Sequence, residues 1–134
     1  MEGVKEIHKH VDKNINKHIA KLQEFIRQPT VSNTGEGMEE GAELLKTYFE
    51  ELGCRRAEIV PTLGWPVVYG DYQAGAEKTL IIYMMYDCMP ADEPAWSVPP
   101  FEARLVKNHR VGDYPPFQTV LMARGATNSK GPLV

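Results

Sequence analysis

A run of seven residues, Thr79 to Met85, contains six large hydrophobic side chains and no charge. Such a run, bounded by polar residues, is typical of a β-strand that is buried inside a sheet. It leads directly into Tyr86 and Asp87, and a carboxylate that follows so many apolar residues is rarely buried without a partner. We therefore expect Asp87 to be paired or functional at the end of a strand. The alternative is an aspartate that turns the chain toward Pro90.

The first half of the chain carries two helical patterns. Apolar residues recur at three- and four-residue spacing over residues 4–26, which predicts one long amphipathic helix that ends before Pro29. A second helix is predicted from about residue 38 to residue 52, with Gly53 as its natural stop.

The predicted strands are short and lie in the second half. Residues 57–61 and 66–72 have strand character, and residues 102–107 and 119–123 are predicted to pair antiparallel across the loop 109–117. Together with the apolar run, the order helix, helix, strand, strand, strand predicts an α/β fold with a mixed sheet. Ligands of such sheets bind outside the carboxyl ends of the strands.

Composition excludes several classes of protein. The 134 residues suffice for one domain with one hydrophobic core, and 15 basic against 18 acidic residues give a net charge of −3. Without a basic stripe interleaved with aromatics, nucleic-acid binding is excluded. No apolar stretch reaches the length of a membrane span, and the N-terminus lacks the apolar core of a signal peptide. Cys54 and Cys88 form no disulfide framework, so a soluble cytoplasmic protein is expected.

After the apolar run come four motifs in a fixed order: Tyr86-Asp87-Cys88-Met89-Pro90, Trp96, Pro99-Pro100-Phe101-Glu102 and Arg124-Gly125-Ala126-Thr127-Asn128-Ser129-Lys130-Gly131. This order resembles the zinc-dependent peptidase and deacylase family of acetylornithine deacetylase, succinyl-diaminopimelate desuccinylase, glutamate carboxypeptidase and carnosinase. The resemblance implies a three-layer sandwich with a mixed sheet, and zinc or manganese as the cofactor. It also implies hydrolysis of amide bonds in small N-acyl amino acids or dipeptides.

Two positions depart from the family pattern. The family has a ligand His where this chain has Met85, and a metal-bridging Asp where it has Asn128. A thioether is a poor ligand for zinc or manganese beside carboxylates. An amide offers one neutral oxygen and does not bridge two cations. We therefore expect no dinuclear zinc pair. A single hard cation such as Mg²⁺ or Mn²⁺ near Asp87 and Asn128 stays open.

Simpler roles are open at each position. Met85 is expected to be a core methionine at a strand end, and Asn128 is alternatively a residue that satisfies backbone groups of its loop before a helix. By resemblance, Asp87 is the catalytic-site carboxylate that orients the metal site.

The resemblance spans nearly the whole chain, yet Val134 lies where a helix after Lys130 is expected to begin. Residues 1–134 are therefore expected to be the N-terminal part of the catalytic domain, without the lid domain. Two functions stay open. The chain is either an inactive part of an amide-bond hydrolase, or a non-catalytic relative that has lost its metal site and serves binding or assembly. An apolar sheet face left open would favour homo-oligomers.

Overall fold

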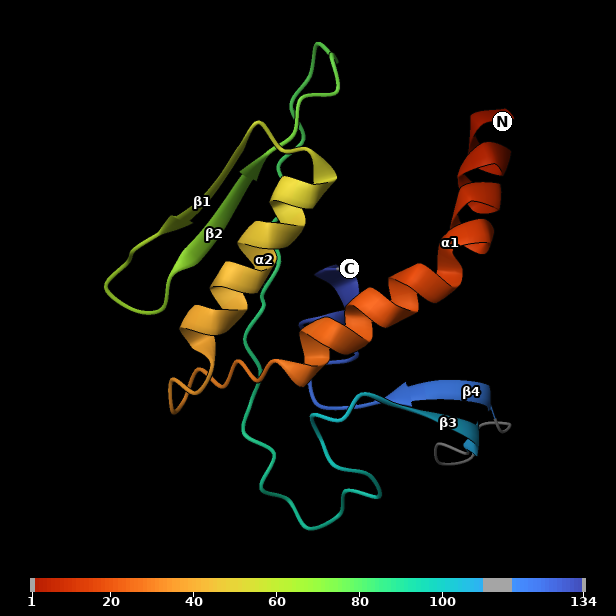
Figure 1. Ribbon diagram of the computed structural model, residues 1–134, viewed down its shortest axis with the longest axis vertical. Coiled ribbons are helices and arrows are strands. Elements are labelled where there is room, and N and C mark those ends of the chain that lie inside the picture. The colour runs from red at the N-terminus through yellow and green to blue at the C-terminus, as the bar shows by residue number, and fades with distance from the viewer. Residues whose placement is uncertain (1, 110–116, 134) are drawn as a thin grey trace.

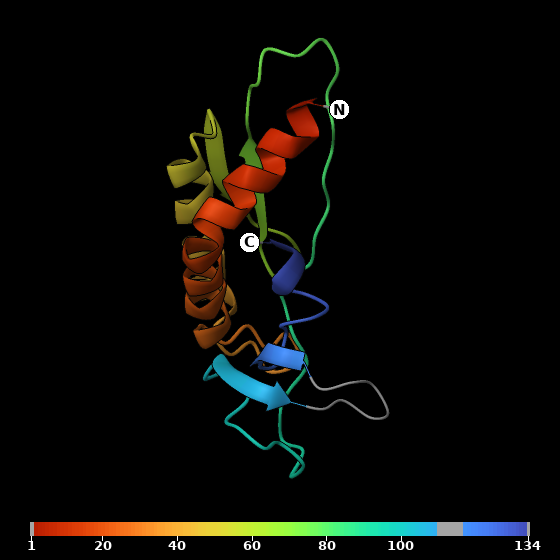
Figure 2. The same cartoon turned by 90° about the vertical axis from the view of Figure 1, so that its right-hand side faces the viewer.

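The computed structural model describes residues 2–109 and 117–133, and Figures 1 and 2 show it from two sides. The observed helices and strands agree closely with predicted elements and confirm the α/β class, although no strand forms at residues 79–85. The predicted loop 109–117 lies outside the described residues except at its two ends. In chain order the elements are α1 (Glu2–Arg27), α2 (Met38–Leu52), β1 (Arg56–Val60), β2 (Val67–Asp71), β3 (Arg104–His109), β4 (Phe117–Met122) and a 3-10 turn at Gly131–Leu133.

Helix α1 packs on the remainder of the chain only through its C-terminal half. Phe25 and Ile26 are completely buried there, and the Phe25 ring meets the Tyr48 ring of α2 edge-on at 5.9 Å. The N-terminal half projects away from the other elements (Figure 1). The apolar stripe on that half therefore remains exposed, and its members are Val4, Ile7, Val11 and Ile15.

Helix α2 covers the β1–β2 hairpin (Figure 1). The two strands pair antiparallel from Arg56 opposite Asp71 to Val60 opposite Val67. The Phe49 ring of α2 lies so close to the hairpin at Gly70 that a Cβ there would stand 2.7 Å from it.

Strands β3 and β4 form a second antiparallel pair, with Leu105 opposite Leu121. The described residues thus contain two separate two-stranded sheets. In place of the single mixed sheet that the sequence predicts, parallel pairing within residues 2–109 and 117–133 is limited to one isolated bridge between Val31 and Cys88. No helix of the described residues is long and apolar enough to cross a membrane.

The prediction of a buried strand at residues 79–85 is wrong. The segment runs as an extended trace without strand pairing in both views (Figures 1 and 2). Met85, expected in the core, is 46% exposed. The physical reason is that a strand requires partners for its backbone groups, and neither described sheet includes this segment among its paired strands.

Candidate functional site

The backbone around Asp87 is held by the residues that follow α1. Val31 forms the parallel bridge with Cys88, and the Cys88 amide donates to the Thr30 carbonyl at 2.8 Å. The Thr30 hydroxyl, which is completely buried, donates to the Tyr86 carbonyl at 2.7 Å. These three contacts fix the position of the chain on both sides of Asp87.

The Asp87 side chain has the partner that its sequence context requires. The Ser32 hydroxyl donates to Asp87 Oδ2 at 2.7 Å, in a partly buried setting. Ser32 is itself positioned, because the Trp65 indole N–H donates to its carbonyl at 2.8 Å. Sequence reasoning missed Ser32, since a serine in a turn-rich loop gives no indication of which distant carboxylate it will meet.

The loop that carries Asn128 is closed on itself. Gly125 adopts a left-handed φ of 82°, and its carbonyl accepts the Lys130 amide at 2.9 Å. A Cβ at Gly131 would stand 1.9 Å from the Ala126 carbonyl oxygen, so only glycine fits there. Glycine at these two positions therefore lets the loop close on itself.

This loop packs beside the Asp87 segment. A Cβ at Gly125 would lie 3.6 Å from Cys88 Cβ, directly after Asp87 in the chain. The tertiary structure therefore brings together the two motifs that the sequence separates by about forty residues. Asn128 itself is exposed on the loop.

Lys130 joins the same loop to the C-terminal end of α1. It is completely buried, and its ammonium donates to the Phe25 carbonyl at 3.0 Å and to the Gln28 carbonyl. The ammonium also lies 4.9 Å from the centre of the Phe25 ring. A lysine here satisfies carbonyls that the end of a helix leaves without partners and complements the negative end of the helix dipole. Burial lowers the pKa of Lys130 to about 8.

The side chains at the two ligand positions of the family pattern, Met85 and Asn128, do not suit a pair of zinc or manganese ions. Among the described residues, no three His, Cys, Asp or Glu side chains are grouped as a metal ion would need. Asp87 offers one carboxylate, which already accepts a hydrogen bond from the Ser32 hydroxyl. Met85 offers a thioether and Asn128 an amide. Met85 and Asn128 therefore supply neither the imidazole nor the bridging carboxylate that the family pattern has at these two positions.

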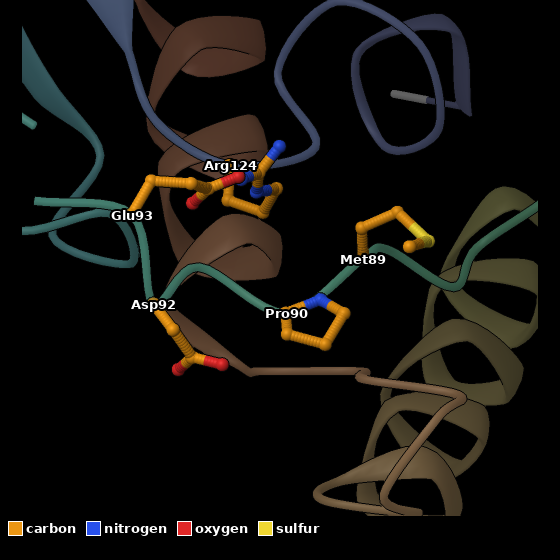
Figure 3. A pocket seen from close by; sticks show the side chains of 5 residues that line it. All are labelled: Met89, Pro90, Asp92, Glu93 and Arg124. Atoms are coloured by element: carbon orange, nitrogen blue, oxygen red, sulfur yellow. The ribbon is translucent and has the colours of Figure 1, made fainter. Parts of the chain in front are cut away.

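A shallow pocket is lined mainly by the segment that follows Asp87 in the chain, and Glu93 and Arg124 form an ion pair there (Figure 3). Its other lining residues are Met89, Pro90 and Asp92. The Trp96 indole N–H donates to Glu93 at 3.0 Å, and the Arg124 guanidinium lies 5.1 Å from the Trp96 ring centre. Arg124 Nε is buried without a hydrogen-bond partner among the described residues.

We expect the Glu93 carboxyl to titrate near pH 2. Hydrogen bonds from Arg124 and then Trp96 lower its pKa from 4.5 to about 2. Because the folded pKa is depressed, the stabilisation is present above pH 4.5 and is lost as pH falls toward 2. NMR titration of the carboxyl carbon measures the titration midpoint of Glu93. Arg124→Gln should return the midpoint toward 4.5, whereas Arg104→Gln, which breaks an ion pair elsewhere, should leave it unchanged.

Two proteins with similar sequences bear on the class of this chain. It is 29% identical to N-formyl-4-amino-5-aminomethyl-2-methylpyrimidine deformylase of Halalkalibacterium halodurans, over 97% of this chain and 29% of that protein. It is 27% identical to the Cys-Gly metallodipeptidase of Schizosaccharomyces pombe, over 92% of this chain and 27% of that protein. No protein-family model matches the chain.

The fold agrees with these relatives. The structure superposes on the crystal structure of an M20 family metallo-carboxypeptidase from Sulfolobus solfataricus with a TM-score of 0.73 and 37% identity, covering 87% of this chain and 24% of that one. These matches confirm the resemblance to the metal-dependent peptidase and deacylase family. The chain spans less than a third of the length of each of these proteins.

Proposed function

We propose that this chain contains the part around Asp87 of a hydrolase fold that acts on amide bonds of small N-acyl compounds or dipeptides. We further propose that the chain does not hydrolyse these amide bonds by itself. The relatives support the reaction class, since they are a deformylase, a metallodipeptidase and a metallo-carboxypeptidase. The chain contributes a positioned carboxylate and a closed loop beside it.

One observation carries the second half of the proposal. The carboxylate stands with a thioether at Met85 and an amide at Asn128, and this donor set does not hold two catalytic metal ions. Metal-assisted hydrolysis needs a metal-bound water that attacks the carbonyl, and a group that accepts its proton. Met85 and Asn128 do not supply the metal ligands that the first task requires.

The test is hydrolysis of Cys-Gly and of N-formyl and N-acetyl amino acids by the purified chain, with Zn²⁺ or Mn²⁺ added. We expect rates equal to those of the buffer and metal alone. The Asp87→Asn variant is the matched control, because it keeps the size of the side chain and an acceptor for Ser32. Turnover that disappears in this variant would show that the chain is itself catalytic, contrary to the proposal.

Metal binding gives a second readout that does not depend on activity. Calorimetry with Zn²⁺ should detect no two-ion binding to the wild type. In the double variant Met85→His and Asn128→Asp, which restores the two ligand types of the family, we expect Zn²⁺ affinity at least about tenfold higher. Two ions bound to the wild type would contradict the donor-set argument.

Binding or assembly is the second candidate function. The exposed apolar segment at residues 79–85 favours it, because an uncovered surface of this kind marks an interaction site.

A further inference from the structure

The chain has five asparagines, and Asn128 differs from the other four in its surroundings. It lies exposed in a turn outside the helices and strands, and the residue after it, Ser129, is small. Asn14 and Asn16, by contrast, lie inside α1, where the helix holds the backbone. Asparagine is chemically labile in proteins, because a neighbouring backbone nitrogen attacks its side-chain amide. An exposed turn with a small following residue offers this attack the least steric hindrance.

The nitrogen next to Asn128 is the backbone amide of Ser129. Within residues 2–109 and 117–133 this amide donates to no backbone carbonyl. The next two amides of the loop, those of Lys130 and Gly131, both donate to the Gly125 carbonyl, at 2.9 and 3.3 Å. An amide that donates a hydrogen bond must lose this bond before its nitrogen attacks another group. The Ser129 nitrogen is therefore the unengaged one in an otherwise anchored loop.

The remaining two asparagines lack this combination. The amide that follows Asn33 belongs to Thr34, and it donates to the Val31 carbonyl at 3.2 Å. Asn108 lies in strand β3 and is followed by a histidine, whose larger side chain crowds the attacking nitrogen. The fold thus distinguishes Asn128 from the asparagines that also precede a polar residue outside α1.

We propose that Asn128 is a site of spontaneous deamidation. The Ser129 backbone nitrogen gives up its proton to solvent base and attacks Asn128 Cγ, so that a C–N bond forms and the side-chain nitrogen leaves as ammonia. Water then opens the resulting cyclic imide at either of its carbonyls. The products are an α-linked aspartate and a β-linked isoaspartate, and each carries a carboxylate in place of the neutral amide.

The product changes the charge of a loop that packs beside the Asp87 segment. A Cβ at Gly125 of this loop would lie 3.6 Å from Cys88 Cβ. The α-linked product also has the residue type that the family pattern has at position 128. A carboxylate offers two anionic oxygens to a hard cation, whereas the amide offers one neutral oxygen. Deamidation therefore shifts the ligand chemistry of the loop toward hard cations, whether or not the chain is catalytic.

The experiment is peptide mass spectrometry of the folded chain after incubation at mildly alkaline pH. We expect a mass increase of about 1 Da in the peptide that contains Asn128, since a hydroxyl replaces the amide NH2. Asn128→Gln should slow the reaction roughly tenfold or more, because the longer side chain holds its carbonyl carbon less favourably toward the nitrogen. Asn33→Gln is the matched control and should leave the rate at Asn128 unchanged.

A second variant and the unfolded chain test the structural part of the proposal. Ser129→Gly should accelerate the reaction several-fold, because it removes a buried side chain that restrains the attacking residue. In concentrated urea the fold no longer protects Asn33 and Asn108, so their peptides should also be modified. A folded chain that is modified first at Asn33 or Asn108 would overturn the proposal. So would an Asn128 peptide that stays intact while the unfolded chain is modified.

Discussion

Replacing Lys130 by alanine is expected to destabilise the folded chain by about 3–4 kcal/mol. The variant leaves the Phe25 and Gln28 carbonyls without their donor and opens a cavity where a completely buried side chain stood. Lys130→Met keeps the apolar stem and loses only the ammonium, so we expect a smaller loss of about 2 kcal/mol. Urea unfolding measures both. Lys46→Ala, at a lysine in an exposed ion pair, should change the free energy of unfolding by less than about 0.5 kcal/mol.

The pH dependence separates the charge of Lys130 from its packing. The folded pKa is about 8 and the ordinary value is 10.5, because burial disfavours the ammonium. Between these values the unfolded state binds more protons, so stability rises with pH from 8 to 10.5, by up to about 3 kcal/mol. Below pH 8 the cost of burying the charge is fully present. The difference between the wild-type and Lys130→Met profiles isolates this rise, and a flat difference would contradict a buried, depressed lysine.

Replacing Phe25 by alanine is expected to cost about 4 kcal/mol of stability. Phe25 is completely buried, its ring packs edge-on against Tyr48 at 5.9 Å, and the Lys130 ammonium lies against its face. Phe25→Leu retains much of the buried volume and should cost about 1.5 kcal/mol. Thermal and urea unfolding measure both variants. Leu63→Ala removes an exposed apolar side chain and should change little; a cost for Phe25→Ala below about 1 kcal/mol would mean that α1 is not anchored at this point.

The sequence alone predicts the regular elements well. The three- and four-residue spacing of residues 4–26 places α1, and the pattern that ends at Gly53 places α2. The hairpin β1–β2 and the pair β3–β4 lie within a few residues of their predicted bounds. These features depend on side chains close together in the chain, where periodicity and turn residues act directly.

The order of the motifs and the two departures from the family's ligands are also evident in the sequence. The ability of Met85 and Asn128 to bind a metal ion follows from their residue types alone. Whether Asp87, Asn128 and Met85 serve a reaction stays a prediction. Their structural setting is a different matter, since Met85 was expected in the core and is half exposed.

The tertiary structure alone decides what depends on distant partners. The sequence shows that Thr79–Met85 is apolar, but burial of a strand requires neighbours on both sides, and the described structure provides none. Ser32 reaches Asp87 across 55 residues, and Lys130 reaches the end of α1 across more than 100. No local pattern encodes such contacts, because they form only when packing of the folded chain brings the two segments to the same place.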